Sequence, residues 1–266
     1  MSKIPKIFLK EYIRLSEEQV IDLLINWKSK DGTYTLTHLF HGVYSPRNFH
    51  DFYKYEGCYI TKNILRQNLG FKKGDKPGDF DIIIIPFSNE KIFFERTIAI
   101  EIKIVRPTRL NPKKSPTSLG ITQLNGLIND GFPFISLIHI CMTEPLLDSE
   151  KMDITYSTIP VNSGKKFTFE EYEKSIIDVK LDHFSWFSAD NQIKRLISRR
   201  DLPKFAGISA FGLNYNGETY SLSSCSEELA AFQLGYFNPN KKPDTIKQVE
   251  IHFENNRHLY SMKLIK

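Results

Sequence analysis

The sequence predicts an α/β fold, with a central mixed β-sheet flanked by helices and an additional α+β C-terminal region. The first observation is a set of apolar, strand-like runs at residues 80–85, 97–105 and 134–142. The second is the order of elements between residues 52 and 142, which reads helix, strand, strand pair, helix, strand. This order is typical of a sheet with helices packed on its faces. At 266 residues, the chain is long enough for one large domain or for a core with an appended domain.

Two helices are expected before the first strand. Ser16, followed by two glutamates and a glutamine, is a helix-start signal, and this helix should continue to about Lys28. A polar and aromatic stretch without a clear period follows. The second helix is expected over residues 52–69. It should end at Gly70, which fits the left-handed position after a helix, with Phe71 as the apolar residue that follows.

The middle of the chain alternates strands, loops and a helix. A turn-rich basic loop leads into the strand at residues 80–85, and runs rich in Ile and Phe predict strands at 91–95 and 97–105. Three prolines make residues 106–118 a loop. A helix should then run to Asp130, where a glycine closes it, before the buried strand that follows.

The chain divides by pattern into three parts. We expect an N-terminal helical segment (residues 1–49), a core (residues 50–145) and an α+β C-terminal region of unknown role (residues 146–266). In the last part, Thr168 starts a capping-box pattern before a short helix, and residues 247–264 suggest a terminal hairpin.

Bulk composition limits the function only broadly. A net charge of +5 permits a polyanionic partner such as nucleic acid without requiring one. Three widely spaced cysteines indicate reduced thiols rather than a disulfide framework. No signal-peptide pattern and no run of about 20 apolar residues occurs, so we expect a cytoplasmic protein without a membrane partner.

Charged residues interrupt two of the apolar strands. Asp81 directly precedes four isoleucines, and Glu101 and Lys103 stand within the run AIEIKIV. Charges buried in such segments cost free energy unless they are paired or bind a metal. Side chains alternate faces along a strand, so Glu101 and Lys103 share one face, opposite the isoleucines. If the two strands are neighbours, Asp81 can converge with them on one patch.

Two helical residues are candidates for the same patch. Glu56 falls within an apolar stripe of the helix expected at residues 52–69, together with Ile60 and Ile64. Gln123 borders the apolar stripe of the helix that follows the proline-rich loop. A solvated flank, or an exposed glutamine, is the simpler reading of each residue alone.

A helix Glu, a strand Asp and then Glu-x-Lys on the next long strand resemble the PD-(D/E)XK nucleases, also called restriction-endonuclease-like. The resemblance covers about residues 50–142. It implies a restriction-endonuclease-like core and a metal-dependent endonuclease that hydrolyses DNA phosphodiester bonds in restriction, defence or DNA processing. It assigns catalytic roles to five residues: Glu56, Asp81, Glu101, Lys103 and Gln123. Because many relatives act as dimers, it also implies a homodimer.

The resemblance departs from the family at the first half of the motif. Instead of Pro-Asp, the chain reads Pro77-Gly78-Asp79-Phe80-Asp81, so two aspartates compete for one role. We favour Asp81, because the isoleucine run begins directly after it.

The expected cofactor is Mg²⁺ or Mn²⁺, since these ions prefer oxygen ligands. Asp81 and Glu101 would hold one ion, and Glu56 would help to place that ion or a second. By resemblance, Lys103 would orient or help to deprotonate the attacking water. The simpler alternative for Glu101 and Lys103 is an ion pair on the solvated face of an edge strand.

Two basic clusters flank the acidic strands and are candidates for contacts with DNA phosphates: Lys72, Lys73, Lys76, Arg106, Arg109, Lys113 and Lys114. Ordinary loop solubilisation is the competing explanation. Two other function classes remain open. One is a non-catalytic nucleic-acid-binding subunit that retains the fold, and the other is an interaction module with a fortuitous ion-pair network.

Overall fold

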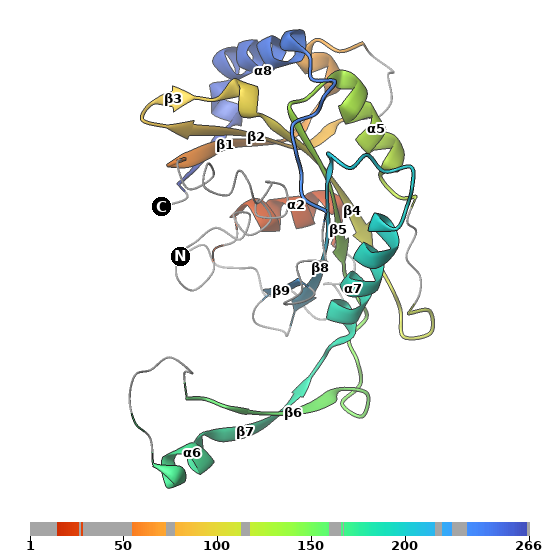
Figure 1. Cartoon of the computed structure of the whole chain (residues 1–266), viewed down its shortest axis with the longest axis vertical. Helices are drawn as coiled ribbons and strands as arrows, with labels where there is room; N and C mark the ends of the chain where they lie inside the picture. Colours follow the sequence, from red (N-terminus) through yellow and green to blue (C-terminus); the bar gives the residue numbers. More distant parts are fainter. Residues whose placement is uncertain are drawn as a thin grey trace.

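The computed structural model describes residues 15–26, 28, 55–72, 78–112, 118–159, 166, 168–215, 220–224 and 233–264. Within these residues, an eight-stranded sheet forms the centre of the molecule (Figure 1). Its strands are β1 (Gly57–Ile64), β2 (Phe80–Ser88), β3 (Lys91–Ile92), β4 (Ile98–Val105), β5 (Phe134–Cys141), β8 (Gly207–Tyr215), β9 (Tyr220–Ser224) and β10 (Ser261–Leu264).

The sheet is mixed. Its strand order is β10-β1-β2-β4-β5-β8-β9, with β3 paired to β2. Pairing is antiparallel from β10 through β4, parallel from β4 to β5 and from β5 to β8, and antiparallel again to β9. The predicted α/β class with a mixed central sheet is therefore confirmed. Strands from after residue 146 extend the same sheet that the strands before it begin.

Helices cover both faces of the sheet (Figure 1). One face packs against α2 (Glu17–Asn26), and the other packs against α5 (Ile121–Asp130), α7 (Phe184–Ile197) and α8 (Pro243–Asn255). In β2, Ile82 and Ile84 join the α2 side, whereas Ile83 and Ile85 join the opposite core. Because both faces are buried, this strand is an unbroken apolar run rather than an alternating one.

The predicted start of the first helix is confirmed. The Ser16 hydroxyl accepts a hydrogen bond from the Gln19 backbone N–H at 3.2 Å, and the Gln19 side chain accepts one from the Ser16 N–H at 2.8 Å. This reciprocal pair satisfies two backbone donors that the helix itself cannot satisfy. The helix ends at Asn26.

The helix predicted over residues 52–69 is wrong in the part of that range that is described. Residues 57–64 form strand β1, and only Arg66–Leu69 form a short 3₁₀ helix. A short apolar run is compatible with either a helix or a buried strand. The β-branched and aromatic residues in this run favour a strand, and β1 lies between β2 and β10 in the sheet. Gly70 does adopt the expected left-handed conformation, with φ of 79°, at the end of the 3₁₀ helix.

The terminal hairpin predicted for residues 247–264 is also wrong. Helix α8 continues to Asn255, and β10 then pairs with β1, more than 200 residues earlier in the chain. Val249 and Phe253 are buried against the sheet at helical spacing, and this periodicity outweighs the local turn signal.

A two-stranded ribbon lies outside the main sheet and extends away from it (Figure 1). It consists of β6 (Met152–Ser157) and β7 (Ile176–Leu181), with the short helix α6 (Phe169–Ser175) preceding β7. The capping box predicted at Thr168 is confirmed, because Thr168 and Glu171 exchange the two expected hydrogen bonds. Among the described residues, no helix is long and apolar enough to cross a membrane.

Candidate active site

The site lies where the pairing of β2 with β4 ends. The two strands are paired from Ile84–Ile98 to Ile82–Ile100, and the next residue of β2 is Asp81. The Asp81 carboxylate accepts a hydrogen bond from the Ile102 backbone N–H at 2.7 Å. A side-chain oxygen thus takes the place of a main-chain acceptor at this point. We call this end of the strand pair, with Asp81, Glu101 and Lys103, the β2–β4 fork.

Lys103 is the centre of the fork. Its Nζ lies 2.7 Å from Glu101 Oε1 and 3.7 Å from Asp81 Oδ2. These three side chains are 11%, 3% and 14% exposed for Lys103, Glu101 and Asp81, respectively. The structure therefore brings together the three strand residues that strand alternation placed on one patch.

A fourth charged residue reaches the fork from α2. Glu17 Oε1 lies 2.9 Å from Lys103 Nζ, although the two residues are 86 positions apart in sequence. Arg106 holds this end of α2 near β4, because its guanidinium donates a hydrogen bond to the Leu15 carbonyl. Sequence reasoning saw Glu17 only as part of a helix-start signal. No local pattern could have placed it beside Lys103.

Burial, and then the charges that the side chains exert on one another, shift the pKa values of the fork. Burial, together with the charge of Asp81, raises the pKa of Glu101 to about 8. Burial raises the pKa of Asp81 to about 6, although Lys103 and the Ile102 N–H oppose this. Burial disfavours the charge on Lys103, but Asp81 and Glu101 outweigh it and raise its pKa above the ordinary value. The lysine is therefore held as a cation, whereas burial and the charge of Asp81 favour the protonated form of Glu101.

The structure distinguishes the two competing aspartates. Asp81 is largely buried and contacts both Lys103 and the Ile102 N–H. Asp79 is exposed in a bend before β2. Asp81 is consequently the aspartate that belongs to the fork.

Glu56 does not belong to the site, which corrects the prediction. It precedes β1, and its carboxylate accepts a hydrogen bond from the Asn89 N–H at 3.2 Å. Because β1 and β2 are antiparallel, residue 57 pairs with Phe87, at the opposite end of β2 from Asp81. At about 3.3 Å per residue, this places Glu56 roughly 20 Å from the fork. The error follows from assigning a strand as a helix.

The start of α5 packs directly over the fork. Gly120 has φ of 79°, and a Cβ at this position would lie 2.6 Å from Leu137 Cδ1 and 3.0 Å from Lys103 Cγ. Only glycine meets both the conformational and the spatial requirement. Gln123 lies in the first turn of this helix, where its side chain is half-buried.

His139 holds the approach to α5 in place and was missed by sequence reasoning. It is fully buried on β5, next to Lys103 in the parallel register. Its Nε2 donates to the Leu119 carbonyl at 3.1 Å, and its Nδ1 accepts from the Gln192 amide at 2.7 Å. Burial lowers its pKa to about 4, so the ring is neutral. A histidine inside the run LIHIC was the available signal.

Two of the described basic candidates are engaged in contacts within the chain. Arg109 forms ion pairs with Glu144 at 3.3 Å and Glu150 at 3.2 Å, and Arg106 binds the Leu15 carbonyl. Lys72 is exposed beyond the 3₁₀ helix. The other four candidates fall outside the described residues: Lys73, Lys76, Lys113 and Lys114.

The donor chemistry of the fork fits Mg²⁺ or Mn²⁺. Among the described residues, no three His, Cys, Asp or Glu side chains form a metal-binding group by themselves. The fork instead offers two carboxylates, Asp81 and Glu101, and Mg²⁺ typically takes one or two carboxylates with water and phosphate oxygens. With Glu17, three carboxylates face one ammonium, so the ionised cluster carries an excess of negative charge.

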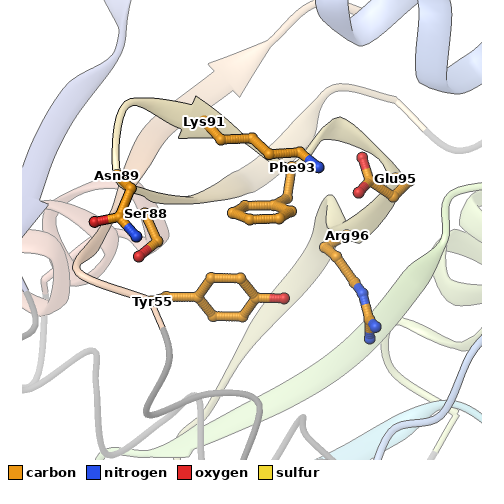
Figure 2. A pocket seen from close by; sticks show the side chains of 7 residues that line it. All are labelled: Tyr55, Ser88, Asn89, Lys91, Phe93, Glu95 and Arg96. Carbon is orange, nitrogen blue, oxygen red and sulfur yellow. The ribbon is translucent and has the colours of Figure 1, made fainter.

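A separate pocket of about 560 Å³ lies at the opposite end of β2 (Figure 2). It is lined by Tyr55, Ser88, Asn89, Lys91, Phe93, Glu95 and Arg96. The Tyr55 and Phe93 rings are in edge-to-face contact at 5.2 Å, and Lys91 Nζ lies 5.1 Å from the Phe93 ring. The pocket therefore adjoins Asn89, the residue that Glu56 contacts, and lies away from the fork.

No protein-family model, curated protein or solved structure matches the chain. The functional interpretation therefore depends on the geometry of the fork.

Proposed function

We propose that the chain is a Mg²⁺- or Mn²⁺-dependent endonuclease of the restriction-endonuclease-like kind, which hydrolyses phosphodiester bonds in DNA. The observation that carries the proposal is the meeting of Asp81, Glu101 and Lys103 at the β2–β4 fork. Buried charges of this kind are costly, and a structural ion pair needs one carboxylate rather than three around one lysine.

The arrangement of the elements supports the same proposal. Strands β1, β2 and β4 form an antiparallel series, and α5 then leads to β5, which is parallel to β4. The aspartate therefore stands at the start of one strand, Glu-x-Lys stands on the neighbouring strand, and a helix follows. The resemblance to the PD-(D/E)XK nucleases was based on these elements preceded by a helix that carries Glu56, and residues 57–64 form strand β1 instead of that helix. We propose that the helix carboxylate comes from Glu17 on α2.

Each side chain has a chemical role in this proposal. Asp81 and Glu101 would hold the divalent cation, which supplies a Lewis acid for the phosphate and a more acidic bound water. Lys103 keeps its proton beside these carboxylates, so it contributes positive charge to the phosphate rather than acting as a base. Glu17 and the Gly120 turn fix the position of the lysine.

The test is cleavage of plasmid DNA by the purified chain with Mg²⁺ or Mn²⁺. Glu101→Ala and Lys103→Ala should each lower the cleavage rate by at least about 100-fold, since each removes a charge from the reacting centre. Glu56→Ala is the matched control, because this carboxylate lies at the other end of β2, and its rate should equal that of the wild type.

Two outcomes would contradict the proposal. Cleavage that survives both Glu101→Ala and Lys103→Ala would remove the fork from the mechanism. Salt-sensitive DNA binding without cleavage at any metal concentration would instead indicate a non-catalytic nucleic-acid-binding subunit.

A further inference from the structure

The pocket of about 560 Å³ shown in Figure 2, which we call the hairpin pocket, is built on a fixed turn. Strand β2 turns into β3 at Asn89 and Glu90, which have φ of 48° and 64°, as in a tight hairpin turn. The Phe93 N–H donates to the Pro86 carbonyl at 2.9 Å, and the Asn89 N–H donates to the Glu56 carboxylate at 3.2 Å. Main-chain hydrogen bonds therefore hold this wall of the pocket in place.

Two aromatic rings form the apolar part of the hairpin pocket. Tyr55 is buried in the core on the α2 side, and Phe93 packs against that core. Figure 2 shows the two rings between Ser88 and Asn89 at one end of the pocket and Arg96 at the other. Within the described part of the chain, the Ser88 hydroxyl and the Asn89 side-chain amide have no hydrogen-bond partner. The pocket thus combines an apolar wall with polar groups that are available to a ligand.

Three cations in and beside the pocket contact aromatic rings instead of carboxylates. The Arg96 guanidinium lies over the Phe237 ring, 4.7 Å from its centroid, and Lys241 Nζ lies 4.4 Å from the same centroid. Lys91 Nζ lies 5.1 Å from the centroid of the Phe93 ring. None of the three forms an ion pair within the described residues. Two cations on one ring repel each other, so an anion bound beside them would stabilise the arrangement.

Positive charge exceeds negative charge in the hairpin pocket. Among the described residues that line it, Glu95 carries the only carboxylate, and this carboxylate pairs with neither Lys91 nor Arg96. Arg109 differs, because two glutamates neutralise its guanidinium. A guanidinium that lies over a ring keeps its N–H donors in its own plane, where they can bind two oxygens of an anion. Arg96 is therefore suited to a phosphate group.

A nucleotide carries the groups that this pocket can contact. Its phosphate suits the cations Lys91 and Arg96, its base suits the wall of aromatic rings, and the polar edge of the base suits Ser88 and Asn89. The volume of about 560 Å³ lies within the roughly 300–1,000 Å³ of small-molecule sites. Inorganic phosphate alone would leave the rings uncovered, and a neutral aromatic ligand would leave the cations unpaired.

We propose that the hairpin pocket binds a nucleotide, with its phosphate at Arg96 and Lys91 and its base against Phe93. The β2–β4 fork and its divalent cation take no part in this site, because the pocket lies at the opposite end of β2. The proposal therefore goes beyond the proposed nuclease activity and does not depend on it.

The test is isothermal titration calorimetry of the full chain in the presence of a metal chelator, which prevents cleavage at the fork. The probes are thymidine 5′-monophosphate, thymidine and inorganic phosphate. Thymidine 5′-monophosphate should bind at least about tenfold more tightly than either of the other two, because it alone contacts both the cations and the rings.

Two variants separate the contacts with the phosphate from those with the base. Arg96→Gln should raise the dissociation constant for thymidine 5′-monophosphate by about tenfold or more, since it removes charge-assisted hydrogen bonds. Phe93→Leu should raise it by at least about fivefold and leave the binding of inorganic phosphate unchanged. Arg257→Gln is the matched control, because Arg257 also lies over an aromatic ring, that of Tyr59, but does not line the pocket. Its constant should stay within about twofold of the wild type.

A short single-stranded oligothymidylate identifies the source of the nucleotide. Tighter binding of the strand than of the mononucleotide, weakened by Arg96→Gln, would support a nucleotide within a strand, and weaker binding would support a free nucleotide. Thymidine 5′-monophosphate that binds no more tightly than inorganic phosphate, or equally well to Arg96→Gln, would overturn the proposal. Cleavage of DNA by a chain that fails this test would leave the nuclease proposal intact, and nucleotide binding without cleavage would do the reverse.

Discussion

The β2–β4 fork and the β6–β7 ribbon depart from the usual burial pattern in opposite directions. The fork buries Glu101 and Lys103 in the sheet, whereas the ribbon exposes Ile177 and Leu181 to water. Buried charges need partners inside the chain, which the fork supplies as ion pairs and a main-chain hydrogen bond. The apolar side chains of the ribbon, in contrast, belong to neither hydrophobic core. The two regions therefore differ in whether the described part of the chain itself provides contacts for the groups that depart from the usual burial pattern.

Replacing one lysine by methionine in each region should give the largest difference between two variants in the free energy of unfolding. Lys103→Met leaves buried Glu101 and Asp81 without their cation and should lower the free energy of unfolding by about 4 kcal/mol. Lys180→Met removes an ion pair whose members are 52% and 80% exposed, and should change it by less than about 0.5 kcal/mol. Urea unfolding of both variants measures the difference. Equal losses would show that the fork is no more than a surface ion pair.

Two glycines test how closely α5 is fitted to the fork. Gly120→Ala forces a side chain into the left-handed region and against Leu137 and Lys103, so it should destabilise the fold by about 2 to 3 kcal/mol. Gly78→Ala, where an added Cβ meets nothing within 4 Å, should stay near the wild-type value. Thermal unfolding checks both. A neutral Gly120→Ala would mean that α5 tolerates displacement from the fork.

The smallest of these effects is a pH dependence that arises at His139. Below pH 6.5 the unfolded histidine binds a proton, while the folded one stays neutral down to about pH 4, so acid lowers the stability of the wild type. Between pH 7 and pH 5 the wild type should lose about 2 kcal/mol relative to His139→Gln. The difference between the unfolding free energies of the two chains removes the contribution of the fork carboxylates, because these carboxylates are present in both chains.

Urea unfolding of the two chains across this pH range measures the difference. Parallel curves for the wild type and His139→Gln would show that the buried ring is not held neutral by its contacts with Leu119 and Gln192.

Sequence reasoning succeeded where a local pattern and burial agree. The strands around Asp81, Glu101 and His139 are long apolar runs, which are buried on both faces of the sheet in the structure. It failed at Glu56, because a helical period and a strand pattern are both compatible with a short apolar run. Sequence reasoning also did not predict the pairing of β10 with β1, because no local signal indicates which distant strand pairs with the edge of a sheet.

By itself, the sequence determined that Asp81, Glu101 and Lys103 are anomalous and that Glu101 and Lys103 share a face, because a two-residue period fixes where strand side chains point. Only the tertiary structure decided which strands are neighbours, where their pairing ends, and that Glu17 rather than Glu56 reaches the lysine. It also decided that the ribbon's apolar side chains lie outside the core. The physical reason is that strand register and helix docking are set by burial between residues far apart in the chain, which local propensity does not encode.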